Sequence, residues 1–118
     1  MSQEIVSFQG LFSVWSYTIG HGRLLLRRTK SSEHPTRVDV LFKDVGWMSL
    51  AVSMQGMRIV ECEMDQANDL LAQAGPMRVA GRKLFLLAGA DCVGHVVASL
   101  VVWNEDEGEY NDASPLLE

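Results

Sequence analysis

Apolar and polar residues alternate along most of this chain in short runs that end at glycine, proline or acidic residues. Between residues 8 and 103 these runs are rich in β-branched and aromatic side chains. In residues 36–43, Val38, Val40 and Phe42 share one face, and mostly charged residues occupy the other. A period of two in runs of this length predicts β-strands that bury at least one face in a core.

Short links flanked by glycine separate several of these runs, which is the sequence signature of antiparallel hairpins. Such links predict three pairings: residues 11–19 with 23–30, 47–54 with 57–63, and 81–89 with 94–103. The last run is apolar on both faces, so both of its faces need a cover.

One segment, residues 65–75, follows the period of an α-helix instead. Asp65 is a suitable N-cap, and Gly75 followed by Pro76 marks the C-terminal end. The apolar residues recur at the spacing of a single helical face: Ala67, Leu70, Leu71 and Ala74. A helix this short is not stable alone, so its apolar stripe is expected to pack on the sheet.

These patterns predict a mainly β fold, an antiparallel sandwich or small barrel of about six to eight strands with one short α-helix. The alternative is an α+β fold in which the helix packs on an open antiparallel sheet. One helix cannot cover strands that are apolar on both faces, so a second sheet layer or a second subunit is expected to do so. At 118 residues the chain can bury roughly 65% of its unfolded surface without disulfides.

The net charge of −5 is distributed unevenly. Residues 104–118 hold six acidic residues and no basic one, whereas residues 1–103 carry a net charge of +1. We therefore expect a single β-rich domain over residues 1–103 and an acidic, flexible tail over residues 104–118. Alternatively, the tail occupies a basic site on its own domain or mimics nucleic acid. The acidic balance argues against binding of duplex nucleic acid.

Neither cysteine usage nor hydropathy points to secretion or to a membrane. Cys62 and Cys92 are expected to be reduced, and the N-terminal residues lack the pattern of a signal or transit peptide. The longest apolar windows are well below the roughly 20 residues that cross a bilayer. We expect a cytoplasmic protein without a membrane span. Histidine and cysteine show no ligand spacing, so neither a metal nor a cofactor is predicted.

The best candidates for ligand contact lie in the first predicted hairpin. Four bases fall within eight residues: Arg23, Arg27, Arg28 and Lys30. Beside Trp15 and Tyr17 of the partner strand, Arg27 and Arg28 could hold an anionic group or single-stranded nucleic acid by charge and stacking. Alternation, however, divides the four bases between two faces. It favours the competing interpretation, cross-strand ion pairs with Asp39, Glu61 or Glu63.

No phosphate-binding loop, nucleophile elbow or zinc-binding helix motif occurs in the sequence, so its function remains open. The first hypothesis is a non-enzymatic interaction domain that self-associates as a homo-oligomer, or binds a protein partner, through an apolar sheet face or edge. The second is a small-ligand carrier with an apolar pocket lined by methionine and aromatic residues, and with Arg27 or Arg28 at its mouth. The third is an enzyme without a visible motif, whose candidates are His21, Asp91, Cys92 and His95.

Overall fold

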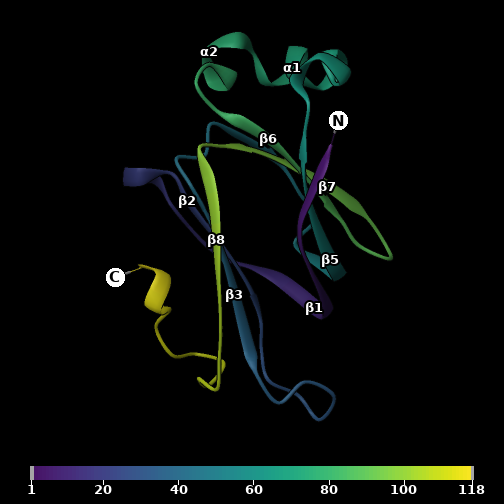
Figure 1. Cartoon of the computed structure of the whole chain (residues 1–118). Coiled ribbons are helices and arrows are strands. Elements are labelled where there is room, and N and C mark those ends of the chain that lie inside the picture. The colour runs from purple at the N-terminus through teal and green to yellow at the C-terminus, as the bar shows by residue number, and fades with distance from the viewer. Residues whose placement is uncertain (1, 118) are drawn as a thin grey trace.

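The alternating runs form one hydrogen-bonded sheet of eight antiparallel strands within residues 2–117, which the computed structural model describes (Figure 1). The strand bounds are β1 Gln3–Thr18, β2 Arg23–Arg28, β3 Arg37–Lys43, β4 Trp47–Ser49, β5 Ser53–Cys62, β6 Lys83–Ala88, β7 Val93–Ala98 and β8 Leu100–Asp106. The predicted mainly β, antiparallel class with one short α-helix is confirmed. The strand order is β4-β7-β6-β5-β1-β2-β3-β8, so the sheet is open, with β4 and β8 at its edges.

Strand β1 joins the two halves of the sheet, which are β4-β7-β6-β5 and β2-β3-β8. Its first part pairs with β5 and its last part with β2. The register with β5 shifts around Gly10, whose φ of +94° suits glycine and lets the strand bend. The two halves thereby face each other. Phe42 of β3 meets Phe85 of β6 in the core between them, with ring centroids 5.5 Å apart.

The strands at the two ends of the sheet also belong to two long segments that lie side by side. Strand β3 continues into β4 and β7 into β8, so residues 37–49 lie antiparallel to residues 93–106. A backbone hydrogen bond from Gly46 N to Val97 O (2.8 Å) continues the pairing between the two registered segments. The predicted final strand is therefore two strands that meet at Ser99. One pairs with β4 and β6, and the other with β3.

The predicted hairpin between residues 47–54 and 57–63 is wrong. Strand β5 runs through Gln55 and Gly56 without turning and pairs with β1 and β6. Gly56 has a φ of +74°, which introduces a local irregularity into the strand rather than a reversal of the chain. The other two predicted hairpins are confirmed, because β1 pairs with β2 and β6 with β7.

The helical segment lies at one end of the sheet (Figure 1). It consists of the 3-10 turn η2 (Met64–Gln66) and the helices α1 (Asn68–Ala74) and α2 (Pro76–Val79). The residues of the predicted apolar stripe are all less exposed than the other residues of α1. The predicted N-cap is wrong: Asp65 lies in η2, and Ala67 takes the N-cap position without a side-chain hydrogen bond. None of the helices described here is long and apolar enough to cross a membrane.

The C-terminal segment, residues 107–117, turns back at the end of β8 and runs beside that strand (Figure 1). Residues 104–106 of the predicted tail belong to β8, and the terminal 3-10 turn η3 (Pro115–Leu117) contacts the same strand. Leu25 of β2 and Leu41 of β3 are register partners whose side chains point to the outward face of the sheet. Both are nevertheless buried. The described residues of the predicted tail are thus in contact with the domain.

Candidate functional site

Arg27 and Asp39 form a buried ion pair on the outward face of the sheet. They are register partners on β2 and β3. The Nε and Nη2 atoms of Arg27 donate to the two carboxylate oxygens of Asp39 at 2.7 and 3.0 Å, and both side chains are 1% exposed. The cross-strand ion pair predicted for Arg27 is therefore present. The remaining terminal nitrogen of Arg27, Nη1, donates to the carbonyl oxygen of Tyr110 at 2.8 Å.

Arg37 continues this pair toward the edge of the sheet. Its Nε and Nη2 atoms each donate to the carboxylate of Asp106 on β8 at 3.1 Å, and Nη2 lies 4.0 Å from the carboxylate of Asp39. The result is an arginine ladder on adjacent strands, made of Arg27, Asp39, Arg37 and Asp106. Alternating charges of this kind neutralise one another, which allows arginines that are only 2% exposed.

The arginine ladder holds the C-terminal segment mainly through its backbone. The carbonyl oxygens of Glu109 and Asp112 both accept from Arg37 Nη1 at 2.9 Å, as Tyr110 does from Arg27. On the surface, Lys30 Nζ reaches the carboxylate of Glu109 at 2.8 Å. The segment therefore lies over basic residues of its own domain, as one sequence alternative held. The buried contacts recognise its main chain rather than its acidic side chains.

Asp106 makes the contact between the arginine ladder and β8 sensitive to acid. Hydrogen bonding from Arg37, opposed by burial, lowers the pKa of Asp106 from its ordinary value of 3.8. A depressed pKa means that its contribution to stability is complete above about pH 4 and is lost as pH falls through the folded-state pKa. We expect Asp106→Asn to destabilise the protein at neutral pH and to approach wild type in acid. Urea unfolding as a function of pH measures this, and a difference independent of pH would contradict it.

Arg28 and Trp15 line a pocket of about 240 Å³ between β1, β2 and the loop after β2, here called the Arg28 pocket. Arg27 reaches the same pocket, and its guanidinium lies 5.1 Å from the centroid of the Trp15 ring. Tyr17 does not line it. Thus three of the four candidate residues come together. The other lining residues were missed by sequence reasoning: Leu11, Ser13, Thr29, Ser31 and His34.

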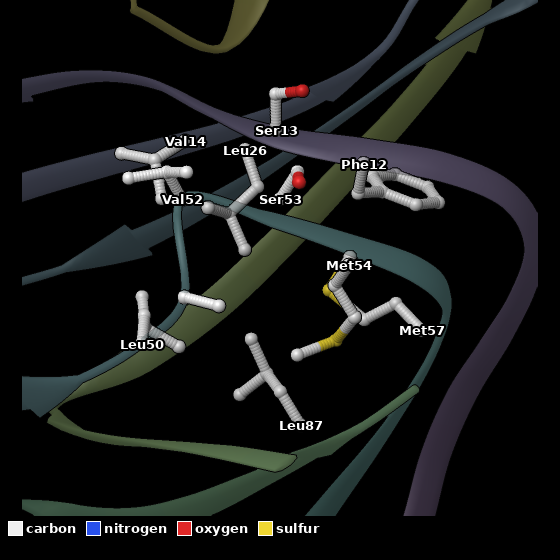
Figure 2. A pocket seen from close by; sticks show the side chains of 11 residues that line it. Phe12, Ser13, Val14, Leu26, Leu50, Val52, Ser53, Met54, Met57 and Leu87 are labelled. Carbon is white, nitrogen blue, oxygen red and sulfur yellow. The ribbon is translucent and has the colours of Figure 1, made fainter. Parts of the chain in front are cut away.

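The interior apolar cavity is too small for a ligand. Met54 and Met57 point into a space beside Phe12, Leu26 and Leu87 (Figure 2). Its volume is about 10 Å³, which is room for about one water molecule. This space has two of the methionines that the carrier hypothesis expects, but neither Arg27 nor Arg28 lines it.

The residues considered for an enzyme lie in three places in the fold. His21 is in the 3-10 turn η1 (Ile19–His21) between β1 and β2, and His95 is on β7. Asp91 and Cys92 lie in the turn between β6 and β7, where Asp91 accepts the backbone N–H of Gln55 at 2.9 Å. Burial, with a smaller effect of Asp91, raises the pKa of the Cys92 thiol, which disfavours the reactive thiolate. Within residues 2–117, no three His, Cys, Asp or Glu side chains gather as metal ligands.

Strand β8 leaves one side without a hydrogen-bonded neighbour among the described strands. It is seven residues long, compared with three for the other edge strand, β4. Val101, Val102 and Trp103 line a shallow hollow of about 270 Å³. Leu100 and Trp103 are each 40% exposed. On this side, β8 therefore has no neighbouring strand within residues 2–117, and the strand carries accessible apolar side chains.

No protein-family model, curated protein or solved structure matches this chain.

Proposed function

We propose that this protein is a non-enzymatic interaction domain that self-associates through strand β8. The observation that carries the proposal is the apolar edge of β8, with which none of the described strands pairs on its outer side. Such an edge presents a row of free N–H and C=O groups, and a second strand can pair with it. A second copy of the same chain is the simplest partner, because an edge strand can pair antiparallel with itself about a two-fold axis.

The composition of β8 supports pairing, and a second copy has to pair beside the C-terminal segment, whose turn η3 contacts the same strand. Edge strands that avoid association usually carry lysine, proline or a bulge. Strand β8 has no lysine or proline, and its two acidic residues, Glu105 and Asp106, lie at its C-terminal end. Arg37 already pairs with Asp106. The rest of the strand is apolar apart from Asn104.

A two-fold axis at Trp103 avoids repulsion between the acidic residues. In that register Leu100 lies opposite Asp106 of the second copy, and Val101 lies opposite Glu105, so no two carboxylates face each other directly. The two exposed Trp103 side chains meet at the centre, where aromatic residues contribute most to an interface. Pairing then joins the two sheets edge to edge.

We expect native mass spectra of the full chain at a multiple of 13.1 kDa. Trp103→Lys should weaken self-association by roughly tenfold or more, because it removes a central aromatic contact and places a charge on the edge. Ile19→Lys is the matched control, since Ile19 is 86% exposed and lies in the turn between β1 and β2. This control should associate like wild type.

A wild-type chain that stays monomeric at all concentrations would overturn the proposal. So would an oligomer that Trp103→Lys and Leu100→Lys leave intact while both variants unfold like wild type. In that case the contact lies elsewhere on the molecule, and the β8 edge has no part in it.

A further inference from the structure

Arg28 is a buried cation that forms no ion pair with any carboxylate among residues 2–117, unlike the arginines of the arginine ladder. It is 7% exposed. Its Nη1 and Nη2 atoms donate to neutral oxygens: Gln9 O at 2.9 Å, Thr36 O at 3.2 Å and Thr36 Oγ1 at 3.1 Å. Its Nε has no hydrogen-bond partner in the described part of the chain. A buried charge is costly unless an opposite charge compensates it.

The carboxylates of the described residues all lie beyond ion-pair distance from the Arg28 guanidinium. Glu105 reaches Arg28 only indirectly, through the hydroxyl of Thr36, which donates to Glu105 and accepts from Arg28. The neighbouring bases are committed to other partners, Arg27 to Asp39 and Lys30 to Glu109.

His34 adds a second nitrogen-bearing side chain beside Arg28. A Cβ atom at Gly10 would lie 2.6 Å from Arg28 Cδ and 3.0 Å from His34 Nε2, so the two side chains meet over this glycine. The hydrogen bonds from Ser31 N to His34 O (2.8 Å) and from His34 N to Ser31 Oγ (3.2 Å) fix the loop that presents the imidazole. The absence of a side chain at Gly10 thus leaves room for the side chains of both Arg28 and His34.

Hydroxyl groups complete the lining of the Arg28 pocket. Ser13 comes from β1, and Thr29 and Ser31 come from the loop after β2. Leu11 and Trp15 form an apolar wall beside them. Donors therefore reach the pocket from β1, β2 and the loop, which suits a tetrahedral oxyanion with several acceptor oxygens better than a planar carboxylate.

From this geometry we propose that the Arg28 pocket binds a phosphate group, either free or carried on a small molecule. Arg28 supplies a buried positive charge, and the other polar lining residues supply further hydrogen-bonding groups: His34, Ser13, Thr29 and Ser31. Trp15 and Leu11 face the remainder of a ligand that carries the phosphate. This site is separate from β8 and does not depend on self-association.

Titration of the full chain with inorganic phosphate and with phenyl phosphate tests the site. Amide shifts in proton–nitrogen NMR spectra should saturate and be confined to residues around Ser13, Thr29 and His34. Tighter binding of phenyl phosphate would indicate a phosphorylated small molecule, and equal binding would indicate free phosphate. Arg28→Gln should weaken binding about tenfold or more, the effect of one lost charge-assisted hydrogen bond.

Two further variants keep the test valid if Arg28→Gln does not fold. His34→Phe and Ser13→Ala leave the hydrogen bonds of Arg28 to Gln9 and Thr36 in place, and each should weaken binding several-fold. Arg58→Gln is the matched control, because this arginine is exposed and pairs with Glu4, which is also on the surface. Shifts that do not saturate, equal binding of acetate, or unchanged affinity in both His34→Phe and Ser13→Ala would overturn the proposal.

Discussion

Replacing Asp39 with alanine is expected to lower the free energy of unfolding by about 3–5 kcal/mol. The substitution leaves the guanidinium of Arg27 buried, with two of its donors unpaired, and removes the nearby charge from Arg37. Breaking a buried pair from one side is costly because the other charge stays out of water. Since small domains are stable by only about 5–15 kcal/mol, this is a large share of the total. Denaturant unfolding measures the change.

Glu4→Ala provides the matched comparison for this prediction. Glu4 pairs with Arg58 at 3.6 Å, and both side chains are about half exposed. Exposed pairs contribute about 0–1 kcal/mol, so this variant should unfold close to wild type. If Asp39→Ala also changes the free energy of unfolding by less than about 1 kcal/mol, then the Arg27–Asp39 pair is not held out of water as described.

Gly108→Ala is expected to destabilise the protein by about 1–3 kcal/mol through overpacking against Arg37. A Cβ at this position would lie 2.6 Å from Arg37 Cζ and 2.7 Å from Nη2. Arginine side chains usually move away from such a clash. Here the guanidinium is fixed by Asp106 and by carbonyl oxygens of the C-terminal segment.

Gly20→Ala is the control, because a Cβ at Gly20 would meet no atom within 4 Å. Thermal unfolding of both variants separates overpacking from the general effect of replacing glycine. Resistance of residues 107–117 to limited proteolysis gives a second measurement, and it should fall in Gly108→Ala alone. An unchanged melting temperature and unchanged proteolysis would mean that the segment does not pack on Arg37.

Much of the fold follows from local sequence pattern. The period of two identified the strands and placed Arg27 and Arg28 on opposite faces. It also gave Asp39 as one of three possible ion-pair partners, together with Glu61 and Glu63. It was harder to predict where one strand ends and the next begins. Gly56 has a turn-like sequence context but lies inside β5. Ser99 separates β7 from β8 within a run whose other residues from 96 to 103 are apolar. In both cases, pairing with distant strands determined the outcome.

The candidate site depends on contacts that leave little trace in the sequence. His34 and Ser13 reach the Arg28 pocket only because β1 bends at Gly10 and the loop after β2 folds back. The packing of the C-terminal segment is even less visible. Buried arginines bind its main-chain oxygens, and every residue carries such an oxygen, so the acidic composition alone predicted a flexible tail.

The position of β8 next to β3 also has a consequence for synthesis of the protein. Residues 37–43 emerge from the ribosome early, but their neighbours, residues 100–106, are made more than fifty positions later. Until then, the carboxylate of Asp106 and the carbonyl oxygens that bind Arg37 do not yet exist. Pairings that join distant parts of a chain form late and slowly. The nascent chain therefore carries an incomplete sheet, with β3 as an edge strand, until residues 100–106 have been translated.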